Sequence, residues 1–495
     1  MKRLLVCVVV MSCASGKPPP PSSPTPAPAV PTPTPTPAVA VAPAPAQHAA
    51  EQQFEAWLAA FNANDRAKLV AFHDTYFPFK DGMPGIDDEL GFRAQTGGFE
   101  IKKVESSTPT SAEILVKEQA SDQFARARVE VEPAEPHRVQ KFELLAIPTP
   151  EDFRPARMSE ADTLAALRAE LEKEAADTFS GAVIVAKNGK AIFAEAYGYA
   201  DRGKQIKNTL DTRFRIGSMN KMFTAVATLQ LVQGKKLALD EPLAKVLPKY
   251  PNHNLATKVT IHHLLTHTGG TGDIFGPEFD AHRKELRTLG DYVKLYGTRD
   301  VAFEPGARMD YSNYGFLLLG VVIEAVSKQS YYDYVARHVF KPAGMTSTSS
   351  PMEDSAREPN RSVGYMRDPK GGGWQPNTDT LPMRATSAGG GDSTVKDLLA
   401  FANALTAHKL LDAEHTTLLT TGKVDMPGGD AKYAYGFMER ILDGRRCVGH
   451  GGGAPGMNGQ LTICDNGYTI VVLANLDPPA AQRVEQFVLD RLPLK

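Results

Sequence analysis

The feature that most limits the fold of this chain is the order of its predicted elements after residue 160. A hairpin over 181–197 comes first and turns at Asn188-Gly189, a dipeptide typical of tight hairpin turns. Helices dominate from 221 to about 408, and strands return over 434–476 before a final helix. The hairpin and the late strands can belong to one sheet only if the two ends of the region after residue 160 lie side by side. We therefore expect an α+β fold, with one antiparallel sheet flanked by helices and an inserted helical subdomain.

The first helix of that middle opens with Ser218-Met219-Asn220-Lys221, directly after an extended run over 212–216. A hydroxyl and an amine three residues apart lie on one face of a helix, about 5–6 Å apart at Cβ, so the amine can take the serine's proton. A second copy, Ser393-Thr394-Val395-Lys396, opens another predicted helix, where Ser393 is expected to be the N-cap. One such tetrad does not separate a nucleophile from a helix cap, so other residues have to decide.

Two further motifs follow Ser218 in the chain. Tyr311-Ser312-Asn313 leads into an apolar helix, and a phenol and an amide in one turn can relay a proton and anchor a substrate. His450-Gly451-Gly452-Gly453 precedes a predicted strand over 460–464, and glycines let a substrate lie against a strand edge. Three dissimilar elements in this order favour Ser218 as a nucleophile.

Each of these two motifs also has a second copy, which we interpret as structural. Tyr250-Pro251-Asn252 contains a proline and is expected to be a loop with no helix behind it. His267-Thr268-Gly269-Gly270 ends a helix-like segment, 260–268, where the glycines would stop the helix. His263 and His267 stand four residues apart, as zinc ligands can, but no glutamate follows His263 and no third ligand is evident. We therefore expect no metal site and no cofactor.

With these motifs in this order, the domain over 160–495 resembles the penicillin-recognising serine enzymes of the class C β-lactamase type from about residue 165 onward. That group contains β-lactamases, penicillin-binding D-Ala-D-Ala peptidases, D-aminopeptidases and esterases. The resemblance makes Ser218 the nucleophile, Lys221 its proton acceptor and Tyr311 a second proton handler. Because a free lysine titrates near 10.4, Lys221 has to be desolvated or placed near other positive charge to act as a base at neutral pH.

The resemblance also implies how a substrate is held. Asn313 matches the residue that holds the lysine and the substrate's amide carbonyl, and His450, Gly452 and Gly453 match the strand that lines the cleft. The backbone N–H groups of Ser218 and Gly453 would form the oxyanion hole. The implied product of the first step is an acyl-enzyme on Ser218.

The third motif departs from the β-lactamase pattern, in which a lysine and a threonine stand at positions 450 and 451 and help to bind a substrate carboxylate. A mostly neutral imidazole and a glycine offer neither group. The pattern is therefore more similar to the esterase and D-aminopeptidase branches. The substrate stays open between an ester, a D-amino acid peptide or amide, including peptidoglycan-derived ones, and a β-lactam. The alternative is a catalytically silent lipoprotein that binds cell wall in the same cleft.

The first residues predict export. Residues 1–12 combine a charged start with an apolar run that is too short to span a membrane, as in a signal peptide. Val10-Met11-Ser12-Cys13 resembles a bacterial lipoprotein cleavage site, which makes Cys13 the lipidated residue, and Ala14 suggests the outer membrane. Residues 13–47 are expected to be a linker, because their Pro, Ala and Thr favour extended polyproline II. We expect an exported protein that faces the periplasm and touches the membrane only through its lipid.

Residues 48–150 predict a separate small α+β domain. Aromatic residues from Phe54 to Phe61 recur at helical spacing, and four strands are expected between 99 and 146. Helices followed by a curved sheet are similar to the cone-shaped domains of the nuclear transport factor 2 (NTF2) kind, a resemblance that implies binding or dimerisation. The oligomeric state does not follow from the sequence.

Charge and cysteine content add two further expectations. A formal net charge of −2 over 495 residues gives no electrostatic reason for nucleic acid binding. Cys447 and Cys464 fall on adjacent predicted strands, where they either form a disulfide in an oxidising periplasm or remain two buried thiols. Small molecules or peptides are therefore the expected partners.

Overall fold

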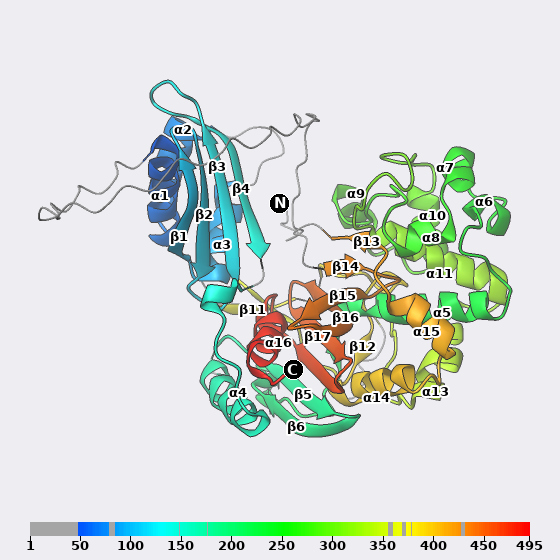
Figure 1. The fold of residues 1–495 in the computed structure, drawn as a ribbon. Helices are drawn as coiled ribbons and strands as arrows, with labels where there is room; N and C mark the ends of the chain where they lie inside the picture. The colour runs from blue at the N-terminus through cyan, green and yellow to red at the C-terminus, as the bar shows by residue number, and fades with distance from the viewer. Residues whose placement is uncertain are drawn as a thin grey trace, which may run out of the picture. The chain divides into compact units, whose positions relative to one another are not determined.

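The computed structural model describes residues 48–495 apart from residues 79–84, 148, 176, 355–359, 369–372, 378 and 427–430. Its described part divides into two compact units (Figure 1). The first contains two helices and most of a four-stranded sheet, and the second contains 146–495 with short neighbouring pieces. The predicted signal peptide, the linker and Cys13 lie outside the described residues. None of the described helices combines the length and the apolar character needed to cross a membrane.

The first unit places helices before a sheet, in the order that the sequence predicts. Its strands neighbour one another in chain order, and their connections are too short for parallel crossovers, so the sheet is antiparallel. The rings of Trp57 and Phe61 lie 4.8 Å apart, and Trp57 also contacts Phe142 at 4.7 Å. The elements are α1 (Ala49–Asn62), α2 (Arg66–Tyr76), β1 (Phe99–Thr108), β2 (Ser111–Glu118), β3 (Phe124–Val131) and β4 (Val139–Ile147). Helix α3 (Ile86–Thr96), which precedes β1, belongs to the second unit from Asp87 onward.

The second unit is built on an eight-stranded sheet in the order β13-β14-β15-β16-β17-β18-β5-β6. The last strand of the chain, β18, pairs antiparallel with β5, so that Val471 lies opposite Ile184. The two ends of the domain therefore close one sheet, and the predicted α+β fold is confirmed. The strands are β5 (Gly181–Lys187), β6 (Lys190–Tyr197), β13 (Val424–Asp425), β14 (Ala431–Tyr433), β15 (Met438–Leu442), β16 (Arg445–Ala454), β17 (Met457–Cys464) and β18 (Tyr468–Ala474).

Helices cover both faces of this sheet, because alternate residues of its central strands are apolar on both sides. Val183 belongs to the apolar cluster that contains α4 (Glu160–Glu174) and α16 (Ala480–Arg491). Ile184, the next residue, belongs to the cluster that contains α5 (Asn220–Gln233) and α14 (Val395–Thr406). A strand buried on both faces reads as a continuous apolar run, which is what β5 and β18 show.

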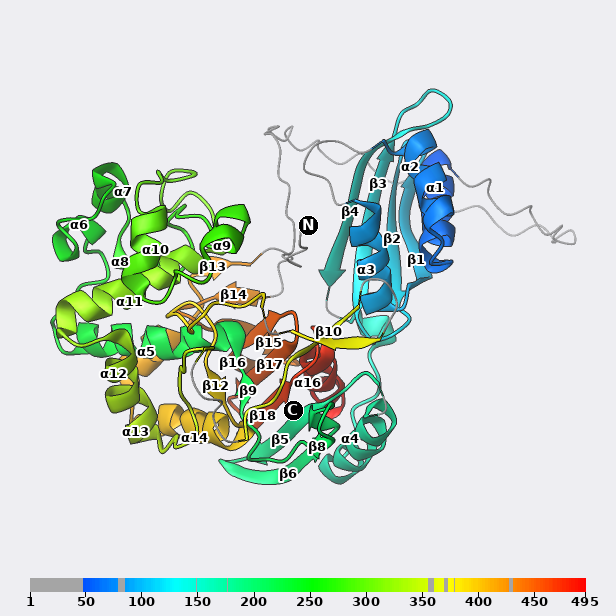
Figure 2. The ribbon, with the colours of Figure 1, turned by 180° about the vertical axis from the view of Figure 1, so that it is seen from behind.

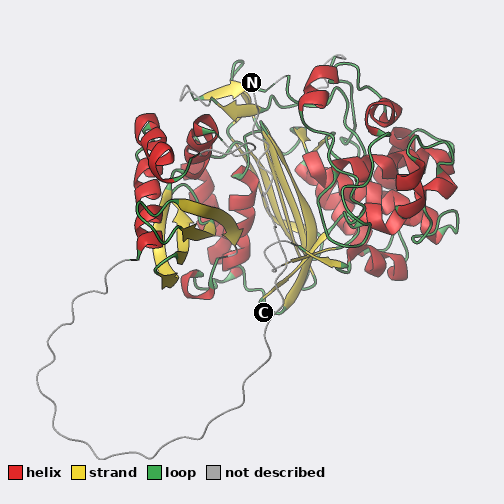
Figure 3. Ribbon diagram, turned by 90° about the horizontal axis from the view of Figure 1, so that it is seen from above, coloured by secondary structure: helices red, strands yellow, loops and turns green. Residues whose placement is uncertain are grey.

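Most of the remaining helices form one lobe beside the sheet, seen in Figures 2 and 3. This lobe is the predicted helical insertion, and it lies between strands β9 and β12 in the chain. Its helices are α6 (Leu243–Val246), α7 (His253–Lys258), α8 (Ile261–Leu265), α9 (Pro277–His282), α10 (Leu289–Tyr296), α11 (Asn313–Ser327), α12 (Tyr331–Val335) and α13 (Lys341–Ala343). Shorter elements are η1 (Glu151–Phe153), β7 (Tyr199–Asp201), β8 (Ile206–Lys207), β9 (Phe214–Arg215), η2 (Gly217–Met219), η3 (Ala336–Phe340), β10 (Tyr365–Arg367), β11 (Trp374–Pro376), β12 (Asp392–Ser393) and α15 (Ala413–Thr420).

Two local predictions are wrong. The cap of α14 is Thr394, whose hydroxyl accepts from the Asp397 N–H, because Ser393 ends β12 and bonds Thr348 instead. A helix does follow Tyr250-Pro251-Asn252: Asn252 caps α7 by accepting from the Leu255 N–H at 2.9 Å. In both places the sequence contains a good cap, and only the tertiary contacts decide which residue serves.

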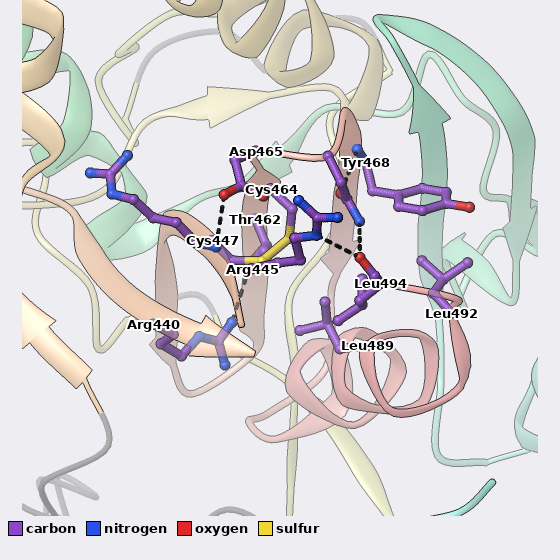
Figure 4. The surroundings of a disulfide bond; sticks show 12 residues. Arg440, Arg445, Cys447, Thr462, Cys464, Asp465, Tyr468, Leu489, Leu492 and Leu494 are labelled. Atoms are coloured by element: carbon purple, nitrogen blue, oxygen red, sulfur yellow. Dashed lines mark hydrogen bonds between the residues drawn. A yellow bond between two sulfur atoms is a disulfide. The ribbon is translucent and has the colours of Figure 1, made fainter. Parts of the chain in front are cut away.

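Cys447 and Cys464 form a disulfide (Figure 4), which settles the alternative left open by the sequence. They lie opposite each other on β16 and β17, with their Cα atoms 4.0 Å apart. Both are buried, and Arg445 beside them donates to the Leu494 carbonyl at 3.0 Å. The bond joins the two strands that carry the glycine-rich segment at their other end.

Candidate active site

Ser218 lies in the tight turn η2, immediately before α5. Gly217 has φ = 54°, a left-handed conformation that favours glycine and lets the chain turn from β9 into the helix. Lys221, one turn along, is fully buried, and its Nζ lies 3.2 Å from Ser218 Oγ. Ser218 itself is half-buried, whereas Lys221 is not exposed at all.

Two oxygens from distant segments hold the Lys221 amine. Nζ donates to Asn313 Oδ1 at 2.7 Å and to the Ala388 carbonyl at 2.5 Å. Asn313 is held in turn, because its Nδ2 donates to Asp273 Oδ2 at 2.8 Å. The other carboxylate oxygen of Asp273 accepts from the backbone N–H groups of Ile274 and Phe275. The Lys221 amine that contacts the Ser218 hydroxyl is thus held by Asn313, and Asn313 is held by the Asp273 carboxylate.

His267 packs against the turn that carries Tyr311 and Asn313 and forms hydrogen bonds with its backbone. The His267 ring lies 4.2 Å from the Tyr311 ring, its carbonyl accepts from the Asp310 N–H, and its Nδ1 accepts from the Ser312 N–H at 3.0 Å. Lys221 Nζ lies 4.7 Å from the centroid of Tyr311, which places the phenol beside the amine. His267 was predicted to be structural, and it does act on the backbone, but on the backbone of the site itself.

His450 points into the protein. A carbonyl only accepts, so the 2.5 Å contact from Nδ1 to the Gly451 oxygen makes Nδ1 the protonated nitrogen. Nε2 then accepts from the Tyr433 hydroxyl at 3.1 Å. Burial, together with the nearby positive charge of Lys221, lowers the pKa of His450 to about 3, so the ring is neutral at physiological pH. Both of its nitrogens therefore have protein partners.

Gly452 and Gly453 pass directly behind the serine turn. A Cβ at Gly452 would lie 2.0 Å from the Ile216 carbonyl and 3.1 Å from the Ser218 nitrogen, and one at Gly217 would lie 3.2 Å from the Gly453 nitrogen. Only glycines allow these two backbones to approach so closely. The backbone nitrogens of Ser218 and Gly453 therefore both lie at this close approach of the two segments.

The site thus unites three segments that are far apart in the sequence. The second serine tetrad lies outside it, whereas His267, from the second copy of the third motif, packs on Tyr311. Lys396 of the second tetrad forms a surface ion pair with Asp211 at 2.8 Å. The two histidines that stand four residues apart each accept a backbone N–H: His263 that of Thr260, and His267 that of Ser312. Among the residues that the structure describes, no three His, Cys, Asp or Glu side chains gather as a metal site would need.

Sequence reasoning missed Asp273 as a site residue and underrated His267. Asp273 belongs to none of the motifs, and His267 was interpreted as the structural copy of one; both reach the site through contacts across 40 or more residues. The positive φ of His267, 59°, has no counterpart in a sequence pattern either.

A buried lysine on a serine hydroxyl, set between an antiparallel sheet and a helical lobe, defines the class of β-lactamase-fold serine hydrolases. The chain belongs to the Beta-lactamase family, whose pattern it matches over residues 167–495. It is 31% identical over 298 residues to the putative penicillin-binding protein PbpX of Bacillus subtilis, covering 60% of this chain and 70% of that protein.

Solved structures agree with this assignment. The penicillin-binding protein from Bacillus halodurans is similar with a TM-score of 0.58 and 32% identity, over 65% of this chain and 97% of the other. A D-stereospecific amidohydrolase from a Streptomyces species is similar with a TM-score of 0.57 and 30% identity, over the same shares of the two chains.

Proposed function

We propose that this protein hydrolyses an ester or a D-amino acid amide or peptide through an acyl-enzyme on Ser218. The observation that carries the proposal is the contact of 3.2 Å between Lys221 Nζ and Ser218 Oγ, made by an amine that Asn313 and Ala388 already hold. A nucleophile within hydrogen-bond reach of a base that is itself oriented is the geometry of covalent catalysis.

In the proposed first step, Lys221 acts in its deprotonated form: the amine takes the Ser218 proton while Oγ bonds to the substrate's carbonyl carbon. The negative charge moves to the carbonyl oxygen, which the N–H groups of Ser218 and Gly453 stabilise. Tyr311 gives its proton to the leaving group as the scissile bond breaks, and the Lys221 ammonium restores that proton. Water then attacks the ester, with Tyr311 and Lys221 as the base, and releases the acid and free Ser218.

The expected substrate follows from His450. A β-lactam carboxylate needs a cation or a hydroxyl donor at this strand, and His450 is neutral, buried and committed to Tyr433 and Gly451. Gly451 adds no hydroxyl. Esters and amides without that carboxylate should therefore be turned over faster than a cephalosporin, in line with the likeness to a D-stereospecific amidohydrolase. Among D-amino acid compounds, amides and esters that lack a free carboxylate beside the scissile bond are the expected substrates.

A covalent probe tests whether Ser218 is a live nucleophile. A fluorophosphonate or an activated ester should label the intact protein, and Ser218→Ala should lose the label. Ser393→Ala is the matched control, because Ser393 has the same spacing to a lysine but lies against Thr348. The catalytically silent alternative wins if the intact protein takes up neither probe.

A turnover panel tests the substrate class. It compares nitrophenyl esters, D-amino acid amides, D-Ala-D-Ala peptides and a chromogenic cephalosporin at equal enzyme concentration. Faster hydrolysis of the cephalosporin than of every ester and amide would refute the argument from His450.

We also propose that the protein is exported and tethered by a lipid on Cys13, with 13–47 as a spacer and an NTF2-like domain before the hydrolase domain. The support is the pattern of charged, apolar and small residues over 1–13. Labelled palmitate should enter the wild-type protein and not Cys13→Ser, and membrane fractionation should place only the former in the outer membrane. Equal palmitate labelling of the two would contradict the anchor.

A further inference from the structure

The oxyanion hole proposed above depends on where a single peptide unit points, the one between Gly452 and Gly453. We infer that Asn458, a residue outside the family's motifs, is a positioning residue that aims the Gly453 N–H at the oxyanion. The inference rests on the proposed function, because it assigns a role within that same reaction. It is carried by strand register and by two hydrogen bonds of the buried Asn458 side chain.

The register of β16 and β17 fixes the direction of the Gly453 N–H. Pairs in an antiparallel ladder alternate between hydrogen-bonded and non-hydrogen-bonded, and the second kind has the shorter Cα separation, about 4.5 Å. Cys447 and Cys464 are 4.0 Å apart at Cα, which marks them as a non-hydrogen-bonded pair. Gly453 and Asn458 lie six positions along the same ladder, so they are a pair of the same kind. The Gly453 N–H therefore points away from β17.

On that outer side the serine turn is the neighbour. Strand β15 pairs with β16 only as far as Gly449, so it does not cover Gly453. A Cβ at Gly217 would lie 3.2 Å from the Gly453 nitrogen, and one at Gly452 would lie 3.1 Å from the Ser218 nitrogen. The outward N–H is thus directed to the side on which Ser218 lies.

Asn458 acts on the opposite end of the same peptide unit. Its Nδ2 donates to the Gly452 carbonyl at 2.8 Å, and its Oδ1 accepts from the Ala481 N–H at 2.6 Å. These two partners fix which end of the amide is nitrogen and which is oxygen, because a carbonyl only accepts and a backbone N–H only donates. The side chain is fully buried, and α16 anchors it through one of the free N–H groups of its first turn.

This contact has two consequences for the donor. In a planar trans peptide the C=O and the N–H point in opposite directions, so holding the Gly452 oxygen toward Asn458 holds the Gly453 N–H toward Ser218. A hydrogen bond to the carbonyl also polarises the peptide and strengthens its N–H as a donor. The neighbouring pair Gly452–Gly459 is of the hydrogen-bonded kind, so the ladder also holds this carbonyl, and Asn458 adds a second donor to it.

Asn458→Asp tests the role, because the carboxylate still accepts from Ala481 but repels the Gly452 oxygen and turns the peptide. Asn475→Asp is the matched control: Asn475 is also buried and its Nδ2 donates to two backbone carbonyls, those of Tyr199 and Val363, which lie outside the site. The measurements are the acylation rate and KM with a nitrophenyl ester, and the inhibition constant of phenylboronic acid, whose tetrahedral adduct imitates the oxyanion.

Loss of a whole oxyanion donor costs about 100- to 1000-fold, so a misdirected one should cost Asn458→Asp about 10- to 100-fold in acylation rate and a similar factor in boronate affinity. KM should change less than about threefold, and Asn475→Asp should keep the wild-type rate within that factor. If Asn458→Asp does not fold, Asn458→Ser, which removes the amide donor, is measured instead, and the same changes in acylation rate, boronate affinity and KM are expected.

Three results separate the outcomes. A folded Asn458 variant within threefold of wild type in both rate and boronate affinity overturns the inference. An equal loss in Asn475→Asp also overturns it, since the effect would then come from loss of any buried amide. No acylation of the wild-type protein would instead defeat the proposed function.

Discussion

Gly452→Ala would press a methyl group into the turn that carries Ser218, the proposed nucleophile. The added Cβ would lie 2.0 Å from the Ile216 carbonyl oxygen, whereas ordinary van der Waals contact begins at 3.4 Å. The atoms in its way are backbone atoms, which have no rotamer to adopt, so β16 and the serine turn must separate by about 1.4 Å. A misplacement of about 1 Å in an active site can cost about 100-fold in rate. We therefore expect an acylation rate at least about 100-fold lower, equivalent to about 2.7 kcal/mol in the barrier.

The assay is the pre-steady-state burst of nitrophenol from an activated ester, with circular dichroism and thermal unfolding to show that the variant is folded. Gly451→Ala, one residue away on the same strand, is the matched control. Its Cβ would meet only the side-chain amide of Gln460, at 2.6 Å, and that side chain can rotate away. A folded Gly452→Ala with a burst rate within threefold of wild type would refute the reasoning, and so would an equal loss in Gly451→Ala.

Three further outcomes are expected. The folded His450 has a pKa of about 3, and an unfolded imidazole has one near 6.5. Between these values the unfolded state binds the extra proton, so the free energy of unfolding should decrease as the pH is lowered from about 6.5 to about 3, by up to about 5 kcal/mol. His450→Gln should flatten this part of a urea-unfolding series, and an unchanged slope would contradict the burial argument. Reduction of the Cys447–Cys464 bond, which spans 17 residues, should lower the free energy of unfolding by about 3 kcal/mol in urea titrations with and without dithiothreitol, and coincident curves would count against it. Asp273→Ala frees Asn313 Nδ2 and should lower kcat/KM for a D-amino acid amide about tenfold, while wild-type kinetics would show that Asn313 needs no such anchor.

The sequence predicted the contact between the serine and the lysine because their spacing is local. Ser218 and Lys221 face each other through one helical turn, which the tetrad alone predicts. The strands β5 and β18 were equally predictable, since apolar runs bounded by turns need no knowledge of their partners. Local spacing failed where two residues competed for one role, as at the α14 cap, where Thr394 serves and Ser393 does not.

What the sequence by itself determined is therefore the α+β fold, with its inserted helical lobe, and a serine, a lysine and a tyrosine as candidates for acyl-transfer chemistry. The tertiary structure alone decided how these groups are held. Asp273 supports Asn313 across 40 residues, His267 grips the Tyr311 turn, and Asn458 holds the Gly452 peptide. The physical reason is that a hydrogen bond acts over about 3 Å in space and has no fixed spacing in the chain. Motifs record which atoms react, and packing decides where their donors and acceptors point.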